Sequence, residues 1–333
     1  IRYCLLSRGL VDVYKRQNTG VPLSKQSKAH YTDVFSTVMK KMGEREPKLV
    51  AITAAMEDGT GLKRFHNLYP ERFFDVGIAE EHAVTFAAGM AKAGLKPVFA
   101  VYSSFLQRAY DQILHDVCLQ KLPVVFAIDR AGIVGKDGAT HQGIFDLSYL
   151  SSIPNLTIMA PKNKWELSDM LKFAIAADYP VAIRYPRGDA CDLWREMRAP
   201  IVQGRSEVLC EGTDVALFAI GTMVETAWKV KEQLAEREIT ATVVNARFMA
   251  PLDEKAILSA AEKYPLIVTM EENVVSGGFG EHIAALLKEH EAKVKVLPVA
   301  IENRFVEHGD VETLRRVLGI DEKTITDRIC EEL

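Results

Sequence analysis

The segment "DVGIAEEHAVTFAAGMAKAGLKPVFAVY", residues 75–102, contains the pattern from which the fold can be predicted. Its alanine-rich middle begins near Glu81 and stops at Gly94, as expected of a helix that ends at a glycine. The apolar run "PVFAVY" follows directly and is typical of a buried parallel strand. Two adjacent carboxylates, Glu80 and Glu81, stand at the head of this helix. Adjacent helical residues diverge by about 100°, so the two cannot face the same group.

The same alternation of strands and helices continues on both sides of this segment. The apolar runs "KLVAITAAM", "LPVVFAID", "LTIMA" and "VAIRY" predict further buried strands. Helices are expected between them, including one from about Ser104 to Gln120 and an earlier one capped by Thr32. Strands that alternate with helices in this way predict an α/β fold with a doubly wound, mainly parallel sheet.

The pattern divides the chain into two α/β domains. The first is expected over residues 31–195, and a second, smaller one over 213–333, with an aperiodic linker at 196–212. The polar segment 18–30 is interpreted as a further linker. Residues 1–17 have no start methionine, capped helix or periodic strand, and our hypothesis is that they are a non-native tail from adaptor, vector or misassembled DNA. The genomic DNA upstream of the coding region would test this hypothesis.

Composition favours an ordinary globular protein of the cytoplasm. Of 333 residues, 48% are hydrophobic and 26% charged, and the formal net charge of −4 argues against nucleic acid as a partner. No apolar run reaches the roughly 18 residues of a membrane span, so no membrane partner is expected. The cysteines lack C-x-x-C spacing, which fits neither a zinc site nor a disulfide framework. They are Cys4, Cys118, Cys191, Cys210 and Cys330.

Glu80 is the stronger candidate of the two glutamates for chemistry. It closes the apolar sequence "VGIAE", which we interpret as a strand end, so its carboxyl group is expected to be partly desolvated. Such a group suits the sharing of a proton with a heterocycle nitrogen. The alternative is that both glutamates only stabilise the first helical turn through the helix dipole, and the residues alone leave both interpretations open.

The segment "VYSSFLQRAYDQ", residues 101–112, follows a predicted strand. It contains Tyr102, Phe105 and Arg108, and the last two lie three residues apart on one helical face. An aromatic ring with a guanidinium group at its edge could hold a planar ligand. A core aromatic residue beside a surface arginine explains the same pattern.

The segment "DRAGIVGKDGATHQGIFD", residues 129–146, is a glycine-rich loop after a predicted strand. Its four glycines permit a ligand to approach the backbone, and Asp137 and His141 provide polar groups for chemistry. Arg130 in this loop and Arg187 in "RYPRG" both follow strand ends and could together clamp a phosphate. A surface salt bridge explains either arginine singly.

Four of these stretches resemble the transketolase-like thiamine diphosphate enzymes. They are "DVGIAEEHAVTFAAGMA", "YSSFLQRAYDQ", "AIDRAGIVGKDGATHQGIFDLSYL" and "RYPRG". "DRAGIVG" and "FDLSYL" are similar to the branch of that family that makes 1-deoxy-D-xylulose 5-phosphate. The resemblance spans about 18–333 and implies a pyrimidine-binding domain over 31–195 and a transketolase C-terminal domain over 213–333.

The resemblance implies a reaction and a role for each matching residue. Pyruvate would be decarboxylated on thiamine diphosphate, and the two-carbon unit transferred to D-glyceraldehyde 3-phosphate, for isoprenoid and thiamine biosynthesis. Glu80 matches the glutamate that hydrogen-bonds the aminopyrimidine ring, and Phe105 matches the aromatic residue that stacks on it. Glu80 and His141 are the implied catalytic residues, and Arg108 joins Glu80 and Phe105 in binding the cofactor. The implied substrate-binding residues are Tyr102, Arg130, Asp137, His141 and Arg187.

The family's G-D-G motif, which holds the diphosphate and Mg²⁺, has no counterpart in this sequence. We therefore expect the Mg²⁺ ligands in another domain or chain, no metal ligand in this one, and little activity from this chain alone. The resemblance also implies a homodimer. The alternatives are the C-terminal subunit of a split transketolase, a 2-oxoacid dehydrogenase β subunit, which "DGATHQG" fits poorly, and a non-catalytic partner chain of the same fold.

Overall fold

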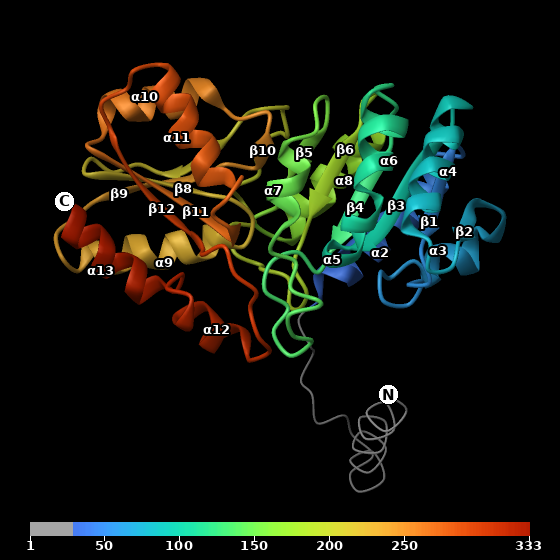
Figure 1. Ribbon diagram of the computed structural model, residues 1–333, viewed down its shortest axis with the longest axis horizontal. Coiled ribbons are helices and arrows are strands. Elements are labelled where there is room, and N and C mark those ends of the chain that lie inside the picture. The colour runs from blue at the N-terminus through green and yellow to red at the C-terminus, as the bar shows by residue number, and fades with distance from the viewer. Residues whose placement is uncertain (1–28) are drawn as a thin grey trace, which may run out of the picture.

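The computed structural model describes residues 29–333, which form two α/β units side by side (Figure 1). The predictions for 1–17 and for most of 18–30 lie outside the described residues. Within 29–333, no helix combines the length and the apolar character required to cross a membrane.

The first unit is built on a seven-stranded sheet with the order β10-β5-β6-β4-β3-β1-β2. All neighbouring strands pair in parallel except β10, which pairs antiparallel with β5. The prediction of a doubly wound, mainly parallel sheet is therefore confirmed. The strands are β1 (Leu49–Thr53), β2 (Phe73–Asp75), β3 (Lys96–Tyr102), β4 (Val125–Asp129), β5 (Thr157–Met159), β6 (Val181–Arg184) and β10 (Phe248–Ala250).

Helices cover both faces of this sheet, with α4, α6 and α7 on one face and α2 and α8 on the other (Figure 1). Side chains of β1 alternate between these faces, since Val50 and Ile52 join the core under α4 while Leu49 and Ala51 join the core under α2 and α8. The longer helices are α2 (Tyr31–Arg45), α4 (Glu80–Lys92) and α8 (Lys164–Ala176). The shorter ones are α3 (Lys63–Leu68), η1 (Pro70–Arg72), α6 (Tyr110–Gln112) and α7 (Asp146–Ser151).

The helix expected from about Ser104 to Gln120 is present over residues 103–118, but it is not α-helical throughout. The chain instead forms α5 (Ser103–Leu106), the 3₁₀ turn η2 (Gln107–Ala109), α6 and the π-helical segment η3 (Ile113–Cys118). Apolar spacing indicates that a segment is helical but does not separate α, 3₁₀ and π hydrogen bonding, which differ by one residue per turn or less.

Two helix starts also differ from expectation. Helix α2 is capped by His30, and the hydroxyl of Thr32 instead donates to Asp129 Oδ2 at 2.8 Å. Strand β2 ends at Asp75, so the apolar sequence "VGIAE" is a loop that leads into α4 and not a strand end. Ile78 in this loop is 79% exposed, so the apolar character of the loop does not come from burial in the sheet.

The second unit contains a five-stranded sheet with the order β12-β11-β8-β9-β7, in which only β7 is antiparallel to its neighbour. Strand β7 lies within the span 196–212 that the sequence indicated as a linker. The strands are β7 (Glu207–Cys210), β8 (Val215–Ala219), β9 (Ala241–Asn245), β11 (Leu266–Val274) and β12 (Lys295–Ile301). The helices are α9 (Met223–Ala235), α10 (Glu254–Lys263), α11 (Phe279–Glu289), α12 (Val311–Val317) and α13 (Glu322–Glu332).

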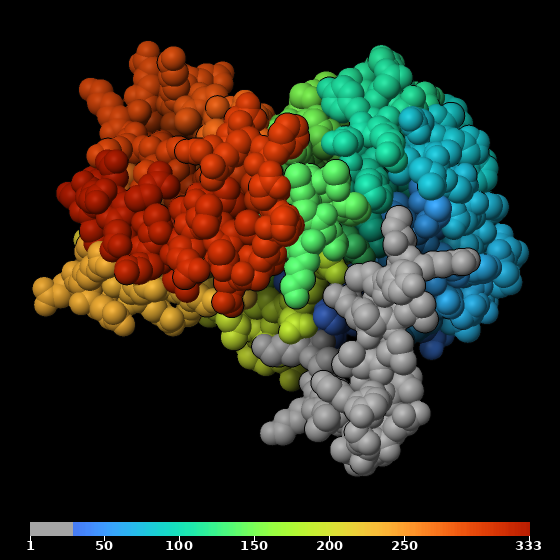
Figure 2. Space-filling model, turned by 60° about the horizontal axis from the view of Figure 1, so that its bottom comes forward, coloured from blue at the N-terminus to red at the C-terminus, as the bar shows by residue number. Residues whose placement is uncertain are grey.

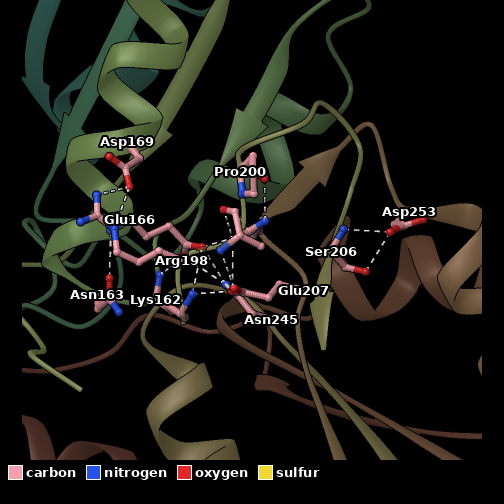
Figure 3. A network of polar contacts seen from close by, with 12 residues as sticks. Lys162, Asn163, Glu166, Asp169, Arg198, Pro200, Ser206, Glu207, Asn245 and Asp253 are labelled. Carbon is pink, nitrogen blue, oxygen red and sulfur yellow. Dashed lines mark hydrogen bonds and ion pairs between the residues drawn. The ribbon is translucent and has the colours of Figure 1, made fainter. Parts of the chain in front are cut away.

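A buried polar network joins the two units (Figure 3). Glu166 of α8 accepts hydrogen bonds from Arg247 Nε at 2.8 Å and from Asn245 Nδ2 at 2.9 Å. Lys162 and Arg247 also pair with Glu207 of β7. Two cations and two carboxylates thus neutralise each other where the first unit meets the second, which fixes their contact through interactions with specific geometry.

Candidate functional site

The predicted site residues follow the carboxyl ends of β2, β3, β4 and β6, which is where open parallel sheets bind ligands. Tyr102 is the last residue of β3 and pairs in register with Asp129, the last residue of β4. Arg130 follows directly, and Arg187 lies three residues beyond the end of β6. The glycine-rich loop after β4 lies between the two units, next to the orange-red segment of the second one (Figure 2).

Glu80 is the buried member of the glutamate pair. It is the first residue of α4 and only 2% exposed, whereas Glu81 is exposed. Arg108 Nη1 donates to both Glu80 carboxylate oxygens, at 3.2 and 3.4 Å. Because Arg108 is itself half exposed, this carboxylate lies just beneath a surface that a ligand could reach.

The ring of Phe105 is the centre of a group of flat side chains. Its centroid lies 5.6 Å from that of Tyr102 and 5.4 Å from that of His141. The guanidinium carbon of Arg108 lies 5.7 Å from the same centroid, because Phe105 at the end of α5 and Arg108 in the following turn are three residues apart on one helical face. Arg108 therefore contacts both Phe105 and Glu80.

Asp137 connects the two arginines of the loops. Its Oδ2 accepts from Arg130 Nη1 at 3.2 Å and also from Arg187. The guanidinium carbon of Arg130 lies 3.9 Å from the centroid of the Tyr102 ring. Two guanidinium groups thus share one carboxylate at the entrance to the site, and an anionic ligand would compete with Asp137 for them.

The structure brings all eight predicted residues into one connected set. Glu80 contacts Arg108, which lies over Phe105, and Phe105 contacts both His141 and Tyr102. Tyr102 in turn contacts Arg130, and Asp137 joins Arg130 to Arg187. The spacing in the sequence could not predict this set, because its members come from four separate loops.

The glycine-rich loop is held by its own Gln142 and by contacts with the second unit, and the sequence did not indicate these contacts. Gln142 Oε1 accepts from the backbone N–H of Val134 at 2.8 Å, and its Nε2 donates to the carbonyl of Glu307 at 3.0 Å. Glu272 Oε2 accepts from Ile133 N at 3.2 Å. The only signal in the sequence was the polar run "MEEN", which interrupts the apolar pattern of β11.

Glycines at two positions of the site are required by close contacts. A Cβ on Gly132, which has φ +78°, would overlap the carboxylate of Glu272. A Cβ on Gly59 would overlap the hydroxyl of Tyr102. The side chains of Glu272 and Tyr102 therefore need glycine opposite them to reach their positions.

Asp129, beneath the loop, is fully buried, and burial raises its pKa to about 6. We expect Asp129→Asn to remove a pH dependence of stability. Between about pH 4 and 6 the unfolded carboxyl group has lost its proton while the folded one keeps it, so wild-type stability falls as the pH rises. The difference in free energy of unfolding between the variant and wild type should therefore shift by about 2–3 kcal/mol in favour of the variant when the pH is raised from 4 to 7.5. Urea denaturation at the two pH values measures this gain.

The exposed carboxylate of Asp58, which pairs with Lys63, gives the matched control. Asp58→Asn should change the free energy of unfolding by less than about 0.5 kcal/mol at either pH. If Asp129→Asn changed the free energy of unfolding equally at both pH values, the raised pKa of Asp129 would be contradicted.

Within residues 29–333, no cluster of three or more His, Cys, Asp or Glu side chains is arranged to hold a metal ion. The polar groups of the site are instead a buried carboxylate, an imidazole and two arginines that share a carboxylate. The carboxylate can hold a proton on a ring nitrogen of a ligand, and the arginines can bind an anion. Phe105 offers a flat surface for a planar ring.

Two sequence families match this chain. Residues 27–191 match the family described as "Transketolase, pyrimidine binding domain", and residues 204–325 match "Transketolase, C-terminal domain".

Curated relatives at more than half identity share one name. The chain is 55% identical over 315 residues to the 1-deoxy-D-xylulose-5-phosphate synthase of Lachnoclostridium phytofermentans, covering 94% of this chain and 50% of the relative. It is 54% identical over 316 residues to 1-deoxy-D-xylulose-5-phosphate synthase 1 of Geobacter sulfurreducens, covering 94% of this chain and 49% of the relative. The chain thus spans about half the length of these curated relatives.

Solved structures share the fold. A split-gene transketolase, described as an inactive β4 tetramer, superposes with a TM-score of 0.79 at 28% identity, covering 91% of this chain and 98% of that one. The transketolase of Campylobacter jejuni superposes with a TM-score of 0.75 at 18% identity, covering 91% of this chain and 47% of that one.

Proposed function

The chain belongs to the transketolase family, and from this premise we propose that it forms the pyrimidine-binding and C-terminal half of an enzyme that makes 1-deoxy-D-xylulose 5-phosphate. The substrates are pyruvate and D-glyceraldehyde 3-phosphate, and CO₂ is released. The observation that carries the proposal is that Arg108 contacts both the buried carboxylate of Glu80 and the half-buried ring of Phe105.

The chemistry of these side chains fits the aminopyrimidine ring of thiamine diphosphate. Phe105 would stack on the ring, and Glu80 would hydrogen-bond the ring nitrogen opposite the exocyclic amine. When bound, the cofactor supplies the nucleophilic carbon that attacks the ketone of pyruvate. Glu80 holds a proton on that ring nitrogen, and Arg108 keeps the carboxylate in position through its two hydrogen bonds.

The loop residues then bind and orient the substrates. Arg130 and Arg187 hold the phosphate of D-glyceraldehyde 3-phosphate in exchange for Asp137, and the ring of Tyr102 supports Arg130. His141 faces the edge of Phe105, from where it can donate a proton to the acceptor aldehyde as the new carbon–carbon bond forms.

The other half of the site comes from elsewhere. We propose that a separate domain or chain supplies the groups for the diphosphate and Mg²⁺, since the relatives are about twice as long as this chain. We further propose a homodimer, as the family resemblance implies, and a cytoplasmic location, which fits the four free cysteines within residues 29–333.

Reconstitution tests this proposal. The chain is mixed with the N-terminal half of the Lachnoclostridium relative, thiamine diphosphate, Mg²⁺, pyruvate and D-glyceraldehyde 3-phosphate, and product and CO₂ are measured. We expect synthesis with both halves and none above background with this chain alone. Synthesis by the isolated chain would contradict the half-site proposal, and a folded, assembled mixture without pyruvate turnover would contradict the reaction.

A split transketolase subunit is the second candidate. It is favoured by one observation, the split-gene transketolase chain that matches this chain along 98% of its own length. The same mixture separates the two candidates when a ketose phosphate replaces pyruvate as donor. Turnover of the ketose phosphate without CO₂ release would identify a transketolase, whereas CO₂ release from pyruvate identifies the synthase.

A further inference from the structure

A groove of about 440 Å³ lies between helices α2 and α8, and the proposed function makes no use of it. The two helices pack side by side on the sheet face opposite α4 (Figure 1). The groove is therefore separated by the sheet from the helix that carries Glu80. Its volume lies within the range of about 300–1,000 Å³ that is typical of small-molecule sites.

Apolar side chains form the floor of the groove. Val38 is buried, while Val34, Met42 and Trp165 are only half buried, so the groove retains apolar surface that the core has not covered. The indole of Trp165 provides the largest flat surface in this lining. Such a surface favours a planar apolar ring over an extended polar chain.

Cations surround this apolar floor. Lys41 and Arg45 lie one helical turn apart on α2, and neither forms an ion pair among the residues that the structure describes. Lys164 and Lys172 line the groove from α8, and Asp33 is the one acidic residue in the lining. Four cations and one carboxylate give the groove a local charge of +3, against a formal net charge of −4 for the whole chain.

The two α8 lysines, Lys164 and Lys172, form only exposed ion pairs. Lys164 Nζ lies 4.7 Å from the centroid of the Trp165 ring and 3.9 Å from the exposed carboxylate of Asp192. Lys172 pairs at 3.0 Å with Asp169, which also accepts from Arg198. Exposed pairs of this kind are worth less than about 1 kcal/mol, so an anion in the groove can replace them.

We propose that the groove between α2 and α8 binds a small anion that carries a planar apolar ring, such as an aromatic phosphate, sulfonate or carboxylate. The ring lies against Trp165 and the α2 side chains Val34 and Met42. The anionic group faces Lys41 and Arg45, whose charges are unpaired within residues 29–333. This site lies apart from the active-site half and does not depend on the proposed reaction.

The probe for this site is 8-anilinonaphthalene-1-sulfonate, a planar aromatic anion. The sequence contains three tryptophans, so Trp194→Phe with Trp228→Phe leaves Trp165 as the single reporter. We expect saturable quenching of Trp165 at one probe per chain, with an affinity that weakens as salt is added. In this background, Lys41→Glu with Arg45→Glu should weaken binding at least about ten-fold, as loss of two charge contacts predicts.

The matched control reverses two exposed lysines elsewhere, Lys255→Glu on α10 with Lys323→Glu on α13, which changes the net charge of the chain equally. Its affinity should stay within about two-fold of the parent, since charges beyond a Debye length are screened. The proposal is overturned if the probe does not quench Trp165 saturably, or if both charge reversals weaken binding equally. Circular dichroism confirms that each variant is folded before the comparison is made.

Discussion

Glu80→Gln should lower 1-deoxy-D-xylulose 5-phosphate synthesis in the reconstituted enzyme by about 10²–10⁴-fold, the usual contribution of general acid–base catalysis. Glutamine fills nearly the same volume and can still accept a hydrogen bond from Arg108, but it cannot share a proton with the ring nitrogen. The initial rate of CO₂ release from pyruvate, measured at saturating thiamine diphosphate, gives the effect directly. Glu80→Ala should lose at least as much activity.

The adjacent glutamate provides the control. Glu81 is exposed at the same helix end, so Glu81→Gln removes the same charge from the same dipole. It should change the rate by less than about three-fold, as expected for a few tenths of a kcal/mol. If both variants lost similar activity, or if Glu80→Gln stayed active, Glu80 would only be stabilising the helix start.

Glu166→Gln should lower the free energy of unfolding by about 3–5 kcal/mol, because breaking a buried ion pair leaves a charge without compensation. Glu166 is 4% exposed and pairs with Lys162 and Arg247, so the variant leaves two buried cations with one carboxylate, Glu207 (Figure 3). Urea denaturation of the chain near pH 7, followed by circular dichroism, measures the loss.

An exposed pair gives the comparison for this prediction. Glu71 is 69% exposed and lies 3.5 Å from Arg72 Nε, so Glu71→Gln should change the free energy of unfolding by less than about 0.5 kcal/mol. A Glu166→Gln variant as stable as the Glu71→Gln variant would mean that water reaches the network and compensates its charges.

The sequence predicted most of the secondary structure where local pattern and tertiary environment agree. The strand "VVFAID" and the helix "KWELSDMLKFAIAA" appear as β4 and α8 because continuous apolar runs and helical spacing each fit a single environment. The family resemblance was confirmed by both family matches, since "DRAGIVGKDGATHQGIFD" combines glycines and polar groups in an order that few loops share.

The errors lie where a contact from outside the segment decided the local structure. Thr32 was expected to cap α2, but its hydroxyl donates to Asp129, which lies 97 residues away in the chain. The interpretation of "VGIAE" as a strand end was wrong as well, although Glu80 is buried as expected. Its burial comes from the packing of α4 against the sheet and from Arg108, and neither is visible in a local apolar pattern.

The sequence by itself determined the fold class, the family and the residue types of the candidate site, because periodicity and short motifs are local properties of the chain. Only the tertiary structure decided that Glu80, Phe105 and Arg130 belong to one connected set, since they follow β2, β3 and β4, and these strands lie side by side in the sheet only after folding. It also decided that the glycine-rich loop is held by Glu272 and by the hydrogen bond from its own Gln142 to Glu307, because such contacts depend on how the second unit packs against the first.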